Sequence, residues 1–214
     1  MQIIPFPNGI YGATTYLVYD EKSLDAILID CTSSINEISK KIKENNLNLK
    51  YVLITHGHFD HVYCLNELKE KFQNALVFMN KEDMPLLNQV NTQCTMAEVE
   101  QINIPCIDGL LDENTKNLNL GEIPIKIITT KGHSKGGVCY LIENDLFSGD
   151  TLFYESIGRC DLFGGSISEI ERSIKEKLFA LSDEITVYPG HGPKTTIGHE
   201  KIYNPYFGSN YKGY

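Results

Sequence analysis

Residues 51 to 61 read Tyr-Val-Leu-Ile-Thr-His-Gly-His-Phe-Asp-His, an apolar run followed at once by three histidines and an aspartate. The apolar run from Tyr51 to Ile54 is typical of a buried strand. The polar side chains therefore follow the carboxyl end of a strand, which is where open α/β sheets place their ligand sites. These side chains are His56, His58, Asp60 and His61.

The spacing of these four side chains divides them into two groups. His56 and His58 can point to one side of the loop and Asp60 with His61 to another, so that one segment supplies two neighbouring sets of ligands. Imidazole and carboxylate groups suit zinc and similar divalent ions. A single histidine is more often an ordinary surface residue, but four such groups at this spacing favour a metal site.

The other histidines test this hypothesis, because a metal centre needs ligands from elsewhere in the chain. His133 and His191 each follow a short β-like run and lie among glycines, and Asp150 closes a third run of this kind. Four separate strand ends therefore deliver a metal-type ligand, which supports a metal site. His199 lies outside these motifs, and we expect it to be a surface or packing residue.

These motifs resemble those of the metallo-β-lactamase superfamily, in the same order and over almost the whole chain. They are Thr55-His56-Gly57-His58-Phe59-Asp60-His61, His133, Ser148-Gly149-Asp150-Thr151 and Gly190-His191-Gly192. Within the superfamily, the chain is most similar to a short bacterial branch of the glyoxalase II group. The runs that carry this closer similarity are Gly158-Arg159-Cys160-Asp161, the stretch from Gly190 to Glu200, and Asn204-Pro205. The resemblance implies a four-layer αββα sandwich.

The resemblance also implies a ligand set for two divalent metal ions. The first ion would be bound by three histidines, the second by an aspartate and two histidines, and one further aspartate would bridge both. In that order, the residues are His56, His58 and His133, then Asp60, His61 and His191, then Asp150. Zinc is the expected metal, and iron or manganese would suit the same ligands.

The chemistry that follows from such a site is hydrolysis. Two ions about 3.5–4 Å apart can share a water, lower its pKa towards neutrality and hold the resulting hydroxide as the nucleophile, so no side-chain nucleophile is needed. Asp60 and Asp150 are then the catalytic side chains. The resemblance implies a thioester substrate, an S-hydroxyacylglutathione such as S-lactoylglutathione, whose thiolate leaves without much protonation.

Three other functions remain open. A persulfide dioxygenase shares the fold and much of the motif but uses one iron and molecular oxygen, and the intact second ligand set favours a two-metal hydrolase over it. A hydrolase of another ester, thioester or lactam would use the same ligands, although Asp150 replaces the zinc-binding cysteine of the main β-lactamase subclass. A metal-dependent binding module is the non-enzymatic alternative.

Four further residues are assigned candidate roles from their positions in the sequence relative to the metal motifs. Arg159, Tyr154 and Lys135 are candidate substrate-binding residues, although Arg159 could instead pair with Asp161. Asp30 ends a strand and could accept a hydrogen bond from the free imidazole N–H of a ligand histidine. We expect no additional carboxyl-terminal helical region of the kind that supplies much of the glutathione contact in larger glyoxalase II enzymes.

The composition narrows the class of protein. A chain of 214 residues, 42% of them hydrophobic, predicts one domain, 1–214, with a peripheral tail at 203–214. A net charge of −9 without a long basic run disfavours nucleic acid, and no apolar stretch approaches the ~20 residues that cross a membrane. Six widely spaced cysteines and no signal peptide predict reduced thiols in the cytoplasm. We expect a monomer or homodimer that acts on a small-molecule thioester.

The order of the predicted elements gives a mixed α+β or α/β fold. The expected strands are 2–6, 14–19, 24–29, 51–54, 76–79, 123–130, 137–142, 146–149 and 185–188. The expected helices are 35–45, 61–72, 81–87, 96–100 and 167–181. Ser34 with Glu37, and Ser166 with Glu169, form capping boxes at two helix starts. Each half of the chain supplies strands and then a helix, which predicts two sheets face to face with helices outside.

Overall fold

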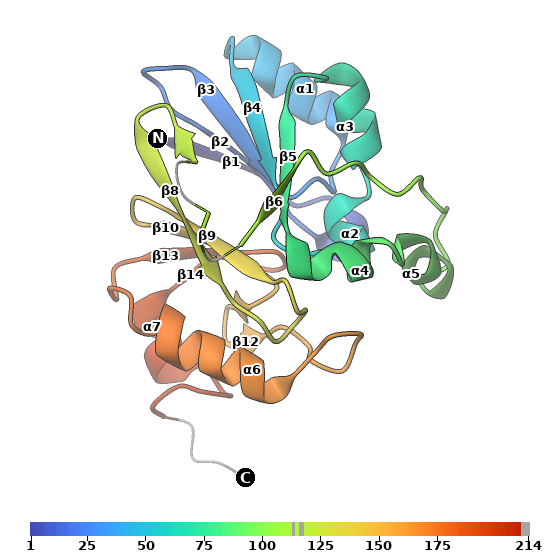
Figure 1. Cartoon of the computed structure of the whole chain (residues 1–214). Coiled ribbons are helices and arrows are strands. Elements are labelled where there is room, and N and C mark those ends of the chain that lie inside the picture. The colour runs from blue at the N-terminus through green and yellow to red at the C-terminus, as the bar shows by residue number, and fades with distance from the viewer. Residues whose placement is uncertain (113, 116–117, 211–214) are drawn as a thin grey trace.

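Two six-stranded sheets pack face to face in the computed structural model, and helices cover the outer face of each sheet (Figure 1). The structure describes residues 1–112, 114–115 and 118–210. The predicted four-layer αββα sandwich is confirmed by this arrangement. Residues 211–214, the end of the tail predicted to be peripheral, lie outside the described residues.

The first sheet combines an antiparallel opening with a parallel second half. In spatial order its strands are β1 (Gln2–Phe6), β2 (Thr15–Tyr19), β3 (Asp25–Ile29), β4 (Asn48–Leu53), β5 (Leu76–Asn80) and β6 (Gly109–Leu111). The chain runs antiparallel from β1 to β3 and parallel from β3 to β6. Parallel neighbours require a crossover connection, and this requirement places helices between these strands.

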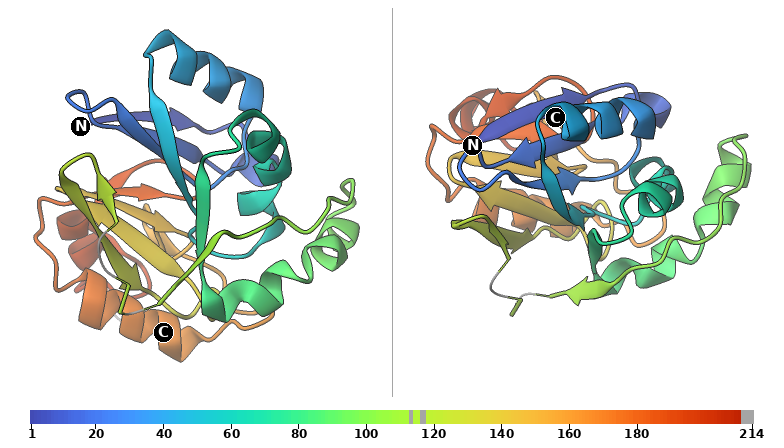
Figure 2. Two further views of the ribbon diagram at one scale, coloured as in Figure 1. Left: turned by 45° about the horizontal axis from the view of Figure 1, so that its top comes forward. Right: turned by 90° about the horizontal axis from the view of Figure 1, so that it is seen from above.

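These crossover segments form the helices of the amino-terminal half. They are α1 (Ile35–Glu44), α2 (Phe59–Val62), α3 (Leu65–Lys71), α4 (Met84–Leu87) and α5 (Val90–Met96), with the short turn η2 (Lys81–Asp83). A further short turn, η1 (Ile10–Gly12), connects the antiparallel strands β1 and β2. Apolar side chains of α1 and α3 are buried against the outer face of the first sheet. The segment with α4 and α5 projects from the edge of this sheet in all views (Figures 1 and 2).

The second sheet is mainly antiparallel. In spatial order its strands are β14 (Thr195–Thr196), β13 (Thr186–Pro189), β10 (Asp145–Gly149), β9 (Val138–Ile142), β8 (Ile123–Thr129) and β7 (Asn119–Leu120). A small hairpin follows β10 and consists of β11 (Leu152–Phe153) and β12 (Ser156–Ile157). The outer face is covered by α6 (Ile167–Arg172), its wider-turn continuation η3 (Ser173–Leu178) and α7 (Ile197–Tyr203). No helix in the described part of the chain is long and apolar enough to cross a bilayer.

Two buried tyrosines join the facing sheets. The hydroxyl of Tyr16 in β2 donates to the backbone oxygen of Pro189 in the second sheet, at 2.7 Å. The hydroxyl of Tyr140 in β9 donates to the backbone oxygen of Ile54, which follows β4 in the first sheet, at 2.8 Å. Buried hydroxyls need such partners. Both acceptors lie just before a histidine of the predicted metal site, so these contacts align the ends of the strands that carry the ligands.

The predicted helix 61–72 is interrupted, and this is a correction. Helix α2 begins earlier, at Phe59, and a break before Leu65 separates it from α3. The backbone N–H of Cys64 donates to the oxygen of Cys31, and the N–H of Cys31 donates to the oxygen of His61. The chain therefore exchanges helical hydrogen bonds for bonds to the loop after β3, and this holds the ligand segment against that loop.

The predicted helix at 96–100 was also wrong. Helix α5 occupies Val90–Met96, and it ends before Glu98, which has a left-handed backbone (φ 57°). Short elements that form only through pairing or tertiary contact were missed, namely β6, β7, β11, β12, β14 and α7. Of the two predicted capping boxes, Ser166 accepts a hydrogen bond from the N–H of Glu169, whereas Ser34 makes no side-chain cap bond.

Candidate metal centre

Seven ligand-type side chains converge from loops at the ends of strands in both sheets. The loop after β4 and the first turns of α2 supply four of them, and the second sheet supplies the other three from the loops after β8, β10 and β13. They are His56, His58, Asp60, His61, His133, Asp150 and His191, the same seven that the sequence motifs predict. His199 is not part of these groups.

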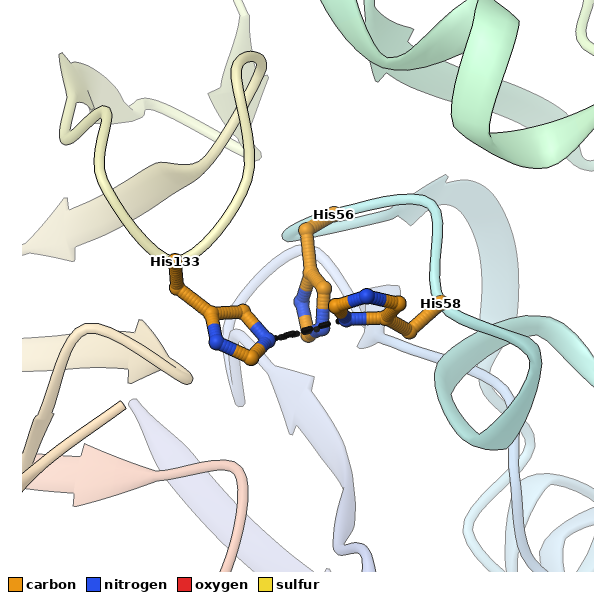
Figure 3. Close-up of side chains that lie close together, drawn as sticks. All are labelled: His56, His58 and His133. Carbon is orange, nitrogen blue, oxygen red and sulfur yellow. Dashed lines mark hydrogen bonds between the residues drawn. The ribbon is translucent and has the colours of Figure 1, made fainter. Parts of the chain in front are cut away.

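Three histidines form one compact set (Figure 3). Nδ1 of His58 lies 2.9 Å from Nε2 of His133, and that nitrogen lies 3.2 Å from Nε2 of His56. Burial and the neighbouring histidines hold the pKa of His56 well below its ordinary value, and they lower the pKa of His58 to about 3. Three imidazoles with nitrogens directed at one point suit a divalent cation.

The second set lies beside the first. Nε2 of His61 is 3.3 Å from Nε2 of His191, and Nε2 of His191 is 3.5 Å from Oδ2 of Asp60. Burial disfavours a charge on His61, but Asp150, Asp30 and Asp60 together raise its pKa well above the ordinary value. A cation that binds this set would displace the proton of His61.

Asp150 lies between the two sets. Its Oδ1 is 3.3 Å from Nε2 of His61, and its Oδ2 is 3.5 Å from Nε2 of both His133 and His191. Burial alone would raise the pKa of this carboxyl, but these three histidines hold it well below the ordinary value. Oδ1 is buried and makes no hydrogen bond. A buried oxygen without a hydrogen bond is unfavourable. A cation at the centre would satisfy it, so the residues fit a metal.

Hydrogen bonds orient the ligand histidines of the second and first sets. Nδ1 of His61 donates to Oδ2 of Asp30 at 2.8 Å, which is the hydrogen bond predicted for Asp30. The hydroxyl of Thr55 also donates to Oδ2 of Asp30, and therefore accepts from Nδ1 of His56 at 3.0 Å. Nδ1 of His133 donates to the backbone oxygen of Arg159 at 2.7 Å. In each case Nδ1 is engaged and Nε2 is the nitrogen left to bind a metal.

A cavity of about 450 Å³ opens onto this centre. Arg159 lines it, but its guanidinium makes two hydrogen bonds to Asp161, each of 2.7 Å. Lys135 lines a separate hollow, and the ring of Tyr154 stacks on that of His199 at 5.2 Å. The structure therefore brings one of the three candidate substrate residues, Arg159, to the centre.

Several residues around the centre were not predicted from the sequence. The buried carboxylate of Asp83 contacts both ligand loops. Apolar side chains, among them Met96 and Phe163, line the cavity. Both features depend on contacts between segments far apart in the chain. The one local signal is that Asp83 follows a predicted strand, as the ligands do.

Comparisons with known proteins agree with this geometry. A family model described as the metallo-beta-lactamase superfamily matches residues 9–191. An uncharacterized protein of Mycobacterium leprae is 34% identical over 96% of this chain and 98% of its own length. A hydroxyacylglutathione hydrolase of Haemophilus influenzae, GloC, is 33% identical over 98% of this chain and 99% of its own length.

Solved structures show the same fold. The BLEG-1 B3 metallo-beta-lactamase is 30% identical, with a TM-score of 0.88 over 99% of this chain and 100% of its own. TTHA1623, solved in a di-iron-bound form, is 30% identical, with a TM-score of 0.85 over 95% of this chain and 100% of its own. ETHE1 from Myxococcus xanthus is 26% identical, with a TM-score of 0.77 over 96% of this chain and 84% of its own.

Proposed function

Because the chain belongs to the metallo-beta-lactamase superfamily, we propose that it is a metal-dependent thioester hydrolase that acts on an S-hydroxyacylglutathione such as S-lactoylglutathione. The observation that carries this proposal is the convergence of two sets of metal-type ligands on either side of a shared aspartate, Asp150. The full-length similarity to a hydroxyacylglutathione hydrolase supports the choice of substrate.

Two divalent ions, zinc first among them, would when bound supply Lewis acidity for a substrate carbonyl and a water of lowered pKa. The three-histidine set would hold one ion, the set of Asp60, His61 and His191 the other, and Asp150 would face both. The carboxylates of Asp60 and Asp150 have lowered pKa values despite burial, because the surrounding histidines favour their ionised form. Both carboxylates are therefore present in the ionised form that would hold the ions beside the attacking water.

The cavity favours a leaving group that needs no proton. Apart from the predicted metal ligands, the ionisable side chains that line it are Tyr11 and Arg159, and Arg159 is paired with Asp161. A thiol has a pKa of about 8.5 and leaves readily as a thiolate, whereas the amine released from a lactam must be protonated. These walls therefore suit a thioester better than a lactam.

A mono-iron persulfide dioxygenase is the second candidate, supported by the similarity to the fold of ETHE1. The complete second set of Asp60, His61 and His191 favours two ions over one. Iron and manganese fit the same donors as zinc. We further propose a cytoplasmic monomer or homodimer whose partner is a small thioester and neither nucleic acid nor a membrane.

The two candidates are separated by measuring thiol release and oxygen uptake on one preparation. We expect protein loaded with zinc to release thiol from S-lactoylglutathione, to lose this activity with a chelator and to regain it when metal is restored. It should consume no oxygen when glutathione persulfide is added. Oxygen uptake by iron-loaded protein, without thioester hydrolysis under any metal, would replace the hydrolase with the dioxygenase.

A further inference from the structure

The cavity beside the metal ligands is bounded by exposed apolar side chains. Phe59 and Leu86 form buried parts of its wall. Around its mouth lie Tyr11, Met96 and Phe163, of which Met96 is 79% exposed and Phe163 52% exposed. Large apolar side chains that gather in the open around a cavity mark a ligand-binding surface.

The charges around this cavity do not match the glutathione part of a thioester. Glutathione carries two carboxylates, and apart from the metal-type histidines the one basic side chain among the described residues that line the cavity is Arg159. Asp161 occupies that guanidinium through two hydrogen bonds. The amide of Gln93 is also engaged, since its oxygen accepts from the N–H of Phe59 and its nitrogen donates to the oxygen of Leu86.

We propose that this cavity binds an acyl group that is bulkier and more apolar than lactoyl, such as an aromatic 2-hydroxyacyl group. This inference rests on the proposed thioester hydrolysis. Charged glutathione remains hydrated at the open mouth, because burial of its carboxylates without a partner is costly. The acyl group gains by burial against Phe59, Leu86 and Phe163.

The test compares S-mandeloylglutathione with S-lactoylglutathione, which share a carrier and differ by a phenyl in place of a methyl group. The zinc-loaded protein should hydrolyse the mandeloyl thioester with a kcat/KM higher by at least about tenfold. Phe163→Ser and Met96→Ser should reduce the ratio of the mandeloyl kcat/KM to the lactoyl kcat/KM. Leu76→Ser, which removes an exposed leucine that does not line the cavity, should leave the ratio unchanged.

Product binding distinguishes failure of this inference from failure of the proposed function. Calorimetry on the metal-loaded protein should show mandelate binding at least about tenfold more tightly than lactate, whether or not any thioester is hydrolysed. Hydrolysis in which lactoyl is preferred, or a ratio that Phe163→Ser does not move, would overturn the acyl-group assignment and leave the hydrolase. Selective mandelate binding without thioester turnover would overturn the hydrolase and leave the cavity assignment.

A separate observation concerns Asp83, whose side chain connects the two sheets beneath the three-histidine set. Asp83 is 1% exposed and belongs to η2, which follows β5 of the first sheet. Its Oδ2 accepts hydrogen bonds from the N–H of Gly57 at 2.9 Å and the hydroxyl of Ser134 at 2.7 Å. Its Oδ1 accepts from the N–H of Gly136 at 2.6 Å.

Two of the three donors to Asp83 are immediate neighbours of metal-type ligands, and the third, Gly136, lies in the same loop as His133. Gly57 lies between His56 and His58, and Ser134 follows His133. The close approach also requires a glycine, since a Cβ on Gly136 would lie 2.6 Å from the backbone nitrogen of Asp83. One carboxylate thus ties together the loops that carry all three histidines.

We infer that Asp83 is a positioning residue for the three-histidine metal set, distinct from Asp30, which orients His61. Partners that orient ligands in this way change metal affinity by about 10- to 100-fold when they are removed. Zinc titration of metal-free Asp83→Ala should therefore show one of the two sites weakened by about that factor, with the other near its wild-type affinity.

Matched variants keep this inference testable if Asp83→Ala does not fold. Ser134→Ala removes one of the three hydrogen bonds and should weaken the same site by a smaller factor. Asp108→Ala is the control, because Asp108 also accepts a backbone hydrogen bond, from Val77, but away from the centre. Equal weakening of both sites, or unchanged zinc binding in a folded Asp83→Ala or Ser134→Ala protein, would overturn the positioning role.

Discussion

The carboxylate of Asp30 accepts a hydrogen bond from Nδ1 of His61 at 2.8 Å. Both side chains are almost fully buried, and Asp30 has a left-handed backbone (φ 59°) at the end of β3. The same carboxylate oxygen accepts a hydrogen bond from the hydroxyl of Thr55, and this hydroxyl in turn accepts one from Nδ1 of His56. One aspartate therefore directs Nε2 of a histidine in each metal set towards the centre.

Replacement of Asp30 should accordingly weaken metal binding. We expect Asp30→Asn to lower the affinity for zinc by about 10- to 100-fold, because an amide can present its N–H to His61 and so favour the wrong tautomer. Calorimetric titration of the metal-free variant measures this. Asp25→Asn, at the partly buried start of the same strand, is the control and should bind zinc as the wild type does, because Asp25 pairs with Asn48 and Lys50 and not with the centre.

Asp150→Ala should remove the carboxylate that faces both metal sets. The variant should lose the second metal and most thioester hydrolysis, because His61 and His191 lose their shared anionic neighbour. Metal analysis and thiol release measure the two effects on one sample. Full activity with both metals retained would show that Asp150 does not bridge them.

His199→Ala should leave metal content unchanged. His199 is hydrogen-bonded to Glu155 at 3.0 Å and lies outside the groups of metal-type ligands. Metal analysis of the variant beside the wild type is the measurement. A lost metal would show that the ligand set contains a residue that the motifs do not reveal.

Tyr140→Phe should destabilise the protein without removing a ligand. The hydroxyl of Tyr140 is fully buried and donates to the oxygen of Ile54, so its loss leaves a buried carbonyl without this partner. We expect the free energy of unfolding to fall by about 1–3 kcal/mol. Denaturant unfolding of the metal-free protein checks this, and Tyr203→Phe, at an exposed site, should have little effect.

The thiols should differ sharply in reactivity. Burial raises the pKa of Cys139 to about 11, whereas Cys106 is exposed. Because the thiolate is the reactive form, alkylation of native protein at pH 8 should modify Cys106 rapidly and spare Cys139. Mass spectrometry identifies the labelled residue. Early labelling of Cys139 would show that the helices covering the outer face of the second sheet move away from it readily.

The convergence of the seven metal-type side chains could be predicted because each lies in a local pattern, an apolar strand followed by histidine or aspartate. The sandwich followed from the same strands, since amphipathic helices between them must cover outer faces. Asp83 could not be predicted in this way, because its three donors lie in segments 26 or more residues away. The helix near Met96 was misplaced because the surrounding Asn, Gln and Thr residues give no clear period.

The short strands β6, β7 and β14 could not be predicted from the local sequence pattern either. Each has two or three residues, and its conformation depends on pairing with a neighbour. The cavity wall has the same origin, since Phe59 and Phe163 meet it from opposite halves of the fold. Local patterns therefore located the metal-type side chains, whereas the lining of the cavity beside them required the tertiary structure.

The measurement that most directly tests a two-metal thioester hydrolase is metal analysis of protein purified without added metal, beside an assay of S-lactoylglutathione hydrolysis on the same sample. The two complete ligand sets predict about two metal ions per chain, together with thioester turnover that a chelator abolishes. One iron per chain with no hydrolysis would contradict this function and favour the dioxygenase.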